Sequence, residues 1–316
     1  MSRLDERVRT CTFRPGWLAR LDFSEAVAWG WNAGSAVSAE DLNLHDENMD
    51  VRMPNEALRA AHGLVRARRK AAAAGGEILS AEGAAWLAGR RRRAPSPARP
   101  ARRGSIAGGG AEAPVLDQLV ARLERLRAGT AEGVDEGVDE WLGLLRVTAG
   151  APRLLQAAAA LEGWRIVEPY PREAYVGSLL VGHWLKDQGR VRSHLLGLEA
   201  GLRVVTRRSR PSAALPLADR ILFWLEVIGE AAAQASEALN RLELARQVAV
   251  GRMGVRRAHS HLGTLIELFL ERPVVTAPMA AQRLKVSPQT ARRLIGQLGG
   301  SITEISGQAR FRAWRL

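Results

Sequence analysis

The sequence contains almost no cysteine and no long apolar run. Only Cys11 is a cysteine among 316 residues, so no intramolecular disulfide can form and no paired-cysteine zinc site is available. Every apolar stretch falls short of the roughly 18 uninterrupted residues that a membrane helix needs. The N-terminus "MSRLDERVRT" is charged from its third residue, unlike a signal peptide. We therefore expect a cytoplasmic protein without a membrane span, and we interpret Cys11 as an inert apolar residue.

Sequence motifs of catalysis and of metal binding are also missing. No Gly-x-Ser-x-Gly, Walker or Gly-x-Gly-x-x-Gly pattern is present. The stretch "EDLNLHDENMD", residues 40–50, lacks the ordered spacing about a glycine turn that hard metals require, and is interpreted as a capped, solvated loop. His259 and His261 have no further ligands nearby and are interpreted as exposed or phosphate-contacting, whereas His183 and His194 lie in helical patterns typical of a core. We expect no metal, no cofactor and no enzymatic activity.

Basic charge, in contrast, is abundant and unevenly placed. The net charge is +13. Residues 252–316 carry eleven Lys/Arg against three acids, and residues 90–110, "RRRRAPSPARPARRGSIAGGG", add seven arginines and no acid. Such segregation favours a polyanionic partner, most economically nucleic acid. An arginine-rich composition would also raise the total charge, but it would not explain the clustering.

The spacing of apolar residues predicts a mainly α fold with four segments. Residues 1–89 are expected to form an N-terminal helical region, and residues 90–112, rich in Pro, Gly and Arg, a disordered linker that serves as a spacer or as a basic tether. Helical spacing returns over residues 113–254, which predicts a bundle-like body. Almost nothing before residue 300 alternates as a strand does. Residues 255–316 form the expected C-terminal domain.

Two stretches of the body carry specific expectations. The tandem repeat "GVDEGVDE", residues 133–140, is predicted to be a loop whose carboxylates lead into a helix that begins near Trp141. The long apolar pattern of residues 221–250 is our candidate contact for a homodimer, although the same pattern is equally consistent with an internal core.

The stretch "TAPMAAQRLKVSPQTARRLIGQL", residues 276–298, has the pattern of two helices joined by a short turn. Thr276 and Ser287 are good N-cap residues, and a proline follows each in the first helical turn. Lys285 occupies the place where glycine is common, so a left-handed backbone there would be slightly strained. The expected contacts between two steeply crossing helices are Ala281, Leu284, Val286, Ala291 and Leu294.

The outward positions of the second helix are the ones that enter the major groove in a helix-turn-helix. Arginine suits guanine edges, glutamine suits adenine, and serine or threonine reach phosphates. Upstream, "HLGTLIELFLERP" predicts the first helix of a three-helix core; downstream, "ITEISGQARFRAWRL" predicts two short strands, the hairpin of a winged variant. The alternative is a small helical subdomain with solvated arginines. The predicted contacts to double-stranded DNA are Ser287, Gln289, Thr290, Arg292, Arg293, Arg310 and Arg312.

Five stretches carry a family resemblance: "SRLDERVR", "RLDFSEAVAWGWNAG", "AEDLNLHDENMDVR", "AAALEGWRIVEPYPREAYVGSLL" and "RPVVTAPMAAQRLKVSPQTARRL…GQARFRAW". Through them the chain resembles a bacterial family of uncharacterised proteins that join a helical domain of unknown function to a C-terminal helix-turn-helix DNA-binding domain. The resemblance covers most of the chain. It implies this architecture and DNA binding, as in a transcriptional regulator, without a known target.

The pattern "RPVVT…A…L.VS..TA" is also similar to the C-terminal winged helix of many Fic-family nucleotidyl transferases. Fic catalysis uses a His-Pro-Phe stretch, whose histidine is the base, and a Gly-Asn-Gly turn that holds phosphate. Here "EPYPREAYVG" places Glu168 where the histidine should be, Pro169 and Tyr170 fit, and the glycine turn is absent. This remote resemblance implies a Fic-like scaffold that has lost its catalytic motif. A Fic-like transferase with or without residual activity, and a helical interaction module, are the alternatives to a DNA-binding regulator.

Overall fold

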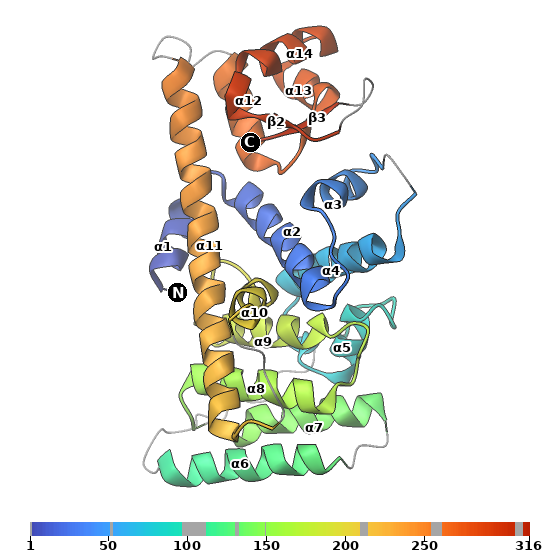
Figure 1. Cartoon of the computed structure of the whole chain (residues 1–316), viewed down its shortest axis with the longest axis vertical. Helices are drawn as coiled ribbons and strands as arrows, with labels where there is room; N and C mark the ends of the chain where they lie inside the picture. The colour runs from blue at the N-terminus through green and yellow to red at the C-terminus, as the bar shows by residue number, and fades with distance from the viewer. Residues whose placement is uncertain are drawn as a thin grey trace. The chain divides into compact units, whose positions relative to one another are not determined.

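The structure of the protein, a computed structural model, describes residues 2–50, 53–96, 112–129, 133–148, 150–208, 214–253, 261–306 and 312–316. Within these ranges helices dominate and short strands occur near the C-terminus (Figure 1), which confirms the mainly α fold predicted from the sequence. Most of the predicted linker lies outside the described residues. Contacts group the chain into two compact units, one made of residues 1–5 and 63–232 and the other of residues 6–62 and 233–316. The segment boundaries expected from composition stay predictions.

Helices and one short 3-10 helix build the first unit. Its elements are η1 (Gly76–Ile78), α5 (Ala81–Leu87), α6 (Glu112–Ala128), α7 (Val134–Val147), α8 (Arg153–Val167), α9 (Tyr175–Asp187) and α10 (Leu198–Thr206). Three further helices contribute residues to both units, and these are α1 (Ser2–Thr10), α4 (Glu56–Ala73) and α11 (Leu217–Met253).

The core of the first unit forms around tryptophans on α7 and α8. The rings of Trp141 and Trp164 meet edge to face with centroids 5.0 Å apart, and the Trp141 indole donates a hydrogen bond of 2.7 Å to the Ala160 carbonyl oxygen. Small residues allow this close approach, since Ala157 through Ala160 are fully buried and a Cβ at Gly177 would lie 2.3 Å from the Trp164 ring. Trp141 and Trp164 are therefore core residues.

The predicted loop at residues 133–140 is wrong, because α7 begins at Val134 and includes the repeat. Its two carboxylates in the first turn interact favourably with the helix dipole. Val138 and Trp141 are fully buried, and Leu145 continues the same face at helical spacing. The repeat has the composition of a loop, but burying this face outweighs the modest helix propensities of Gly, Val and Asp.

A buried carboxylate connects α8 to α11 within the first unit. Glu162 is fully buried and accepts hydrogen bonds from Arg165 at 2.7 Å, from the Trp224 indole at 2.9 Å and from Arg220. Burial alone would raise the pKa of Glu162, but the hydrogen bonds from Arg165 and Trp224 and the nearby positive charges lower it overall. The carboxylate is therefore held in its charged form.

The second unit joins an N-terminal helical segment to the C-terminal segment. Its further helices are α2 (Arg14–Asn32), α3 (Ala39–Asp46), α12 (His261–Glu271), α13 (Ala277–Leu284), α14 (Pro288–Gln297) and the 3-10 helix η3 (Gly299–Ser301). Its strands are β1 (Val275–Thr276), β2 (Thr303–Glu304) and β3 (Ala313–Arg315), which form an antiparallel sheet in the order β1-β3-β2. The predicted pairing of two short strands downstream of the second helix is present as β2 and β3.

The sheet and the N-terminal segment share one small apolar cluster. Leu44 of α3 packs with Val274 and Ala313, and Met49 and Ile305 lie against them. Residues more than 200 positions apart in the sequence thus form one core. This arrangement follows from burial of apolar surface, which takes no account of sequence distance.

The apolar pattern of residues 221–250 on α11 is mostly part of the core. Its buried members include Trp224, Val227, Ile228, Leu239 and Leu242. Leu222, Leu244, Val248 and Val250 remain exposed. The buried residues of this pattern thus belong to the core of the protein. A homodimer contact through the exposed residues stays a prediction.

Candidate nucleic-acid interface

Two capped helices, α13 and α14, form the predicted helix-turn-helix. The Thr276 hydroxyl accepts a hydrogen bond of 3.3 Å from the Met279 N–H and starts α13; the Ser287 hydroxyl accepts one of 3.2 Å from the Thr290 N–H and starts α14. Each helix has a proline in its first turn, where no intrahelical donor is lost. Both N-cap predictions are confirmed. The caps fix where α14 begins and so which of its residues share a face.

The turn between the helices passes through Lys285 in a left-handed conformation, with φ 54° and ψ 44°. Its N–H caps the Ala281 carbonyl, and the Val286 N–H bonds the same oxygen at 3.1 Å. A side chain in this region costs about 1 to 2 kcal/mol relative to the right-handed form. The expected strain at Lys285 is therefore present, and the two hydrogen bonds hold the turn closed.

Buried apolar side chains hold α13 and α14 together against α12. The predicted contacts Ala281, Leu284, Ala291 and Leu294 are all buried, whereas Val286 is only half-buried. Leu265 and Phe269 of α12 are fully buried beneath them, which completes the three-helix core (Figure 1). Because these side chains of α14 face the core, the opposite face of α14 points to solvent.

The predicted contact residues of α14 divide into two groups. Gln289, Arg292 and Arg293 are exposed, and the two arginines lie three and four positions after Gln289, so all three side chains are on the outward side of the helix. Ser287 is exposed but already serves as the N-cap, and its hydroxyl also lies 2.9 Å from that of Thr290, which is half-buried. The geometry thus leaves the first three side chains available to a ligand and gives the hydroxyls a structural role as well.

Some lysine and arginine side chains of residues 261–306 and 312–316 form ion pairs with glutamates, and others do not. Arg272, Arg283, Arg312 and Arg315 each pair with a glutamate, and the partners of Arg272 and Arg315 come from the N-terminal helix α3 and its end. Lys285, Arg292 and Arg293 are exposed, and no acidic side chain pairs with them in the described part of the chain. The uncompensated positive charge of residues 261–306 therefore lies on α14 and on the turn before it.

The arginine before β3 is engaged within the protein. Arg312 pairs with Glu304 of β2, and its guanidinium lies 5.4 Å from the ring centroid of Trp314. The hydrogen bond from Arg312 lowers the pKa of Glu304 and correspondingly raises the pKa of Arg312. Arg310, the other predicted hairpin contact, lies outside the described residues.

Sequence reasoning counted Lys285 among the basic residues of the C-terminal domain and as a strained turn residue, but did not include it among the DNA contacts. Its position two residues before the N-cap Ser287 was the available signal, because residues at the start of the second helix approach the DNA backbone. The ion pairs with α3 had no signal in the sequence. They depend on tertiary contacts between residues 225 and 275 positions apart.

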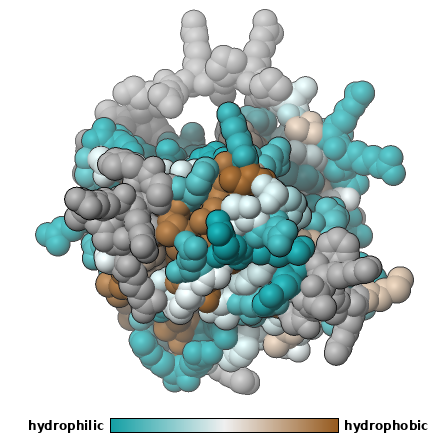
Figure 2. All heavy atoms as spheres, turned by 90° about the horizontal axis from the view of Figure 1, so that it is seen from above, coloured by the Kyte–Doolittle hydropathy of each residue, from teal (hydrophilic) through white to brown (hydrophobic). Residues whose placement is uncertain are grey.

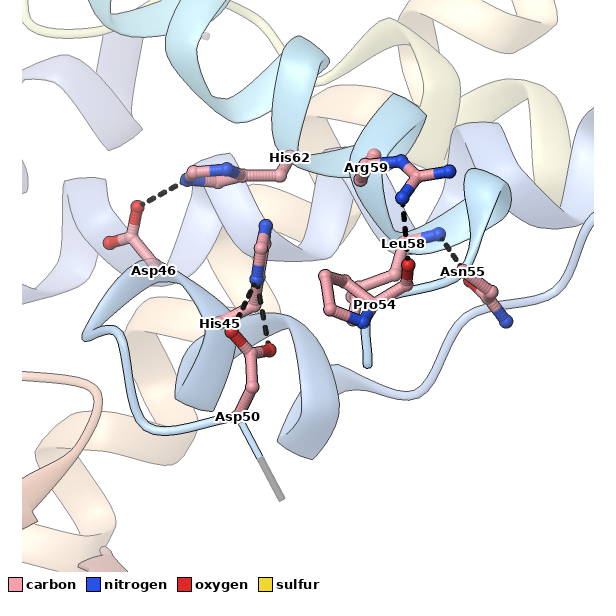
Figure 3. A network of polar contacts seen from close by, with 8 residues as sticks. All are labelled: His45, Asp46, Asp50, Pro54, Asn55, Leu58, Arg59 and His62. Carbon is pink, nitrogen blue, oxygen red and sulfur yellow. Dashed lines mark hydrogen bonds and ion pairs between the residues drawn. The ribbon is translucent and has the colours of Figure 1, made fainter. Parts of the chain in front are cut away.

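The acidic stretch of residues 40–50, expected to be a loop, is helical over its first seven residues in α3 and continues as a turn after Asp46, which corrects that interpretation. Ser38 caps α3, and two carboxylates in the first turn suit the helix N-terminus. In Figure 3 the His45 ring faces Asp50 at 2.9 Å and His62 faces Asp46 at 2.9 Å, each histidine having its own carboxylate. Among the described residues no group of three or more His, Cys, Asp or Glu side chains is placed to hold a metal ion.

The other titratable residues weighed from the sequence occupy ordinary positions. His183 and His194 are buried, and burial lowers the pKa of His183. His261 is exposed at the start of α12, whereas His259 lies outside the described residues. Cys11 is half-buried, and burial raises the pKa of its thiol. A raised pKa suits an inert cysteine, since the thiolate is the reactive form.

The position that resembles a Fic active site has a structural role. Glu168 is exposed and ends α8 in a left-handed conformation, with its N–H bonded to the Trp164 carbonyl at 2.8 Å. Pro169 and Tyr170 are buried, and the Tyr170 ring stacks at 6.3 Å from the ring of Trp164. These residues form a helix end and its packing. The Fic resemblance stays a prediction.

None of the helices in the described ranges combines the length and apolarity required to traverse a bilayer. Figure 2 shows hydrophilic side chains interspersed with smaller apolar patches on one face of the molecule.

Comparisons with known proteins agree with this geometry. A family model described as a protein of unknown function (DUF1612) matches residues 132–254, and one described as an HTH DNA-binding domain matches residues 262–316. An uncharacterised protein of Sinorhizobium fredii, y4cF, is 30% identical over 362 aligned residues, which cover 99% of this chain and 93% of the relative. The family predicted from the sequence is confirmed. The chain belongs to the family of proteins that join a DUF1612 domain to a C-terminal helix-turn-helix DNA-binding domain.

Proposed function

We propose that this protein is a cytoplasmic transcriptional regulator that places α14 in the major groove of double-stranded DNA and catalyses no reaction. The hairpin of β2 and β3 acts as a wing that contacts the phosphate backbone. Gln289, Arg292 and Arg293 contact base edges, and Lys285 contacts a phosphate at the entrance to the groove. The family match to a helix-turn-helix DNA-binding domain supports binding to DNA.

One observation carries this proposal: among residues 261–306 and 312–316, the unpaired lysine and arginine side chains lie together on α14 and the turn before it. Lys285, Arg292 and Arg293 lack an acidic partner in the described chain, while the other arginines within these two ranges are paired. An arginine that faces solvent without a partner gives up no ion pair when it binds phosphate or guanine. A solvated basic surface of no function would not require this separation.

We further propose that the protein binds DNA as a homodimer. Proteins of this class commonly bind two half-sites about 34 to 36 Å apart, so that two copies of α14 enter successive major grooves on one side of the duplex. Leu244 and Val248 are exposed four positions apart on α11 and offer an apolar contact for a second copy. Light scattering that shows a monomer both free and on DNA would remove this part of the proposal.

The test is selection of duplexes from a random library with the full-length chain. We expect the wild type to enrich a defined sequence motif, and the double variant Arg292→Ala/Arg293→Ala to lose it. A matched control is Arg9→Ala/Arg241→Ala, which removes the same charge from exposed arginines that pair with Glu6 and Glu237. The control should enrich the wild-type motif. Recovery of no motif by the wild type, or of the same motif by both double variants, would contradict the proposal.

A further inference from the structure

An arginine from the N-terminal region holds the C-terminal end of α12. Arg20 of α2 donates hydrogen bonds to the carbonyl oxygens of Phe269 at 2.6 Å, Leu270 at 3.1 Å and Arg272 at 3.0 Å. It also donates to the Gly16 carbonyl of its own helix at 2.9 Å. One side chain thus donates to three backbone carbonyls within about one turn at a helix end about 250 positions away in the sequence.

The sequence of α12 explains why this end needs an external donor. Within a helix, each carbonyl accepts a hydrogen bond from the N–H four residues later. The last carbonyls of a helix lack this partner and need another donor. The partner of the Phe269 carbonyl would be the N–H of residue 273, which is a proline and has none. The Arg20 guanidinium supplies the missing donor, and its positive charge suits the negative end of the helix dipole.

The environment of Arg20 indicates that the guanidinium is dedicated to this contact. Burial lowers the pKa of Arg20 to about 10, so the group remains charged near neutral pH. No carboxylate pairs with Arg20 in the described part of the chain. Arg20 is half-buried, and the oriented carbonyls at the end of α12 replace the water that its guanidinium loses there.

The approach of α2 to α12 is too close for any side chain at one position. A Cβ added at Gly16 would lie 1.8 Å from the Leu270 carbonyl oxygen, and real Cβ atoms do not approach that closely. The absence of a side chain at Gly16 therefore allows α2 to reach the carbonyls that Arg20 binds. Gly16 and Arg20 are one turn apart and face the same helix end.

The residues held by Arg20 lead directly into the helix-turn-helix. Arg272 is followed by β1 at Val275 and by Thr276, the N-cap of α13. Glu271, the last residue of α12, pairs with Arg283 of α13 at 2.9 Å. A shift of the α12 end would therefore move the start of α13, and α14 packs on α13 through the closed turn.

We propose that the DNA-binding module is discontinuous in sequence, with α2 as an integral part and Arg20 as the positioning residue that sets α12, α13 and α14 for the major groove. This rests on the proposed function. The matched helix-turn-helix domain begins at residue 262, so the module includes a segment far outside that range. The N-terminal region thereby controls DNA binding without touching DNA.

The test compares Arg20→Met and Arg20→Lys in the full-length chain. Affinity is measured at several salt concentrations on a duplex recovered by the selection, and amide hydrogen exchange is measured in the same proteins. Arg20→Met should bind about 2- to 30-fold more weakly, the range for residues that act through packing on a distant ligand, with an unchanged salt slope. Arg20→Lys should recover part of the loss, because an ammonium still donates to carbonyls. Exchange should accelerate in peptides from residues 261–298 and stay unchanged in residues 153–187.

The exposed Arg9→Ala is the control, since it removes one charge without touching α12. Wild-type affinity in folded Arg20→Met, or a salt slope reduced by about one, would overturn the proposal, because the second result would make Arg20 a phosphate contact. If the wild type selects no duplex, the proposed function fails while the exchange experiment still decides the positioning of α12 to α14. The positioning role of Arg20 would then be overturned if amide exchange in Arg20→Met stayed unchanged in residues 261–298, or if it accelerated equally in residues 153–187. Should Arg20→Met not fold, Arg20→Lys carries the same comparison.

Discussion

Replacing Arg292 and Arg293 by alanine should affect DNA binding differently from replacing Arg312. Both residues of α14 are exposed and lack an acidic partner in the described chain, so each is free to hydrogen-bond a guanine edge. Loss of a base contact of this kind costs about 1 to 3 kcal/mol on the correct site, or about 5- to 150-fold in affinity. On a scrambled duplex, which lacks the matching base, the loss should be much smaller.

Arg312 is expected to act through phosphate only. Each phosphate contact contributes about 0.9 to the slope of log affinity against log salt concentration. When one contact is lost, the factor by which affinity falls between about 50 and 200 mM salt should become about 3.5-fold smaller. Arg312 already pairs with Glu304, and part of its charge is compensated before DNA arrives. Its replacement by alanine should therefore reduce the slope by at most about one, and should weaken the selected and scrambled duplexes alike.

Fluorescence anisotropy with both duplexes at four or more salt concentrations separates the two behaviours. The informative quantity is the ratio of affinities for the two duplexes, which should fall for a variant that loses a base contact and stay constant for Arg312→Ala. The assignment of α14 as the reading helix is refuted if Arg292→Ala, Arg293→Ala and the double variant lose affinity equally on both duplexes. Such a result would describe a basic surface without sequence preference.

Further substitutions test the electrostatics and the packing separately. Glu304→Gln should release Arg312 and tighten binding to any duplex at low salt, which titration by anisotropy detects. Lys285→Gly should raise the free energy of unfolding by up to about 1 kcal/mol in urea denaturation, because the left-handed strain is relieved, while the salt slope of DNA binding decreases. Glu162→Gln should cost about 3 to 5 kcal/mol in the same assay, because it leaves the buried Arg220 without its counter-charge. Folding lowers the pKa of Glu162 from 4.5, so the charged carboxylate stabilises the folded protein above about pH 4.5. This stabilisation is lost as the pH falls and Glu162 becomes protonated. The stability of Glu162→Gln should therefore depend less on pH in the acid range.

Local sequence patterns were sufficient for much of the C-terminal segment. The caps Thr276 and Ser287, the prolines after them and the alternation of buried and exposed positions on α14 depend on neighbours within four residues, so spacing alone predicted them. The same reasoning failed at residues 133–140. There the composition resembles a loop, and only the buried face of Val138 and Trp141 makes the segment helical.

The sequence by itself determined the mainly α composition, the two capped helices and the outward face that carries Arg292 and Arg293, because helical periodicity and capping are local properties of the chain. Only the tertiary structure decided which cations remain unpaired and what holds α12 in place. The partners of Arg272 and Arg315 lie on or next to α3, and the donor at the end of α12 is Arg20. No local pattern encodes these contacts, since they arise when distant segments are packed together to bury apolar surface and satisfy backbone groups that their own helices leave unbonded.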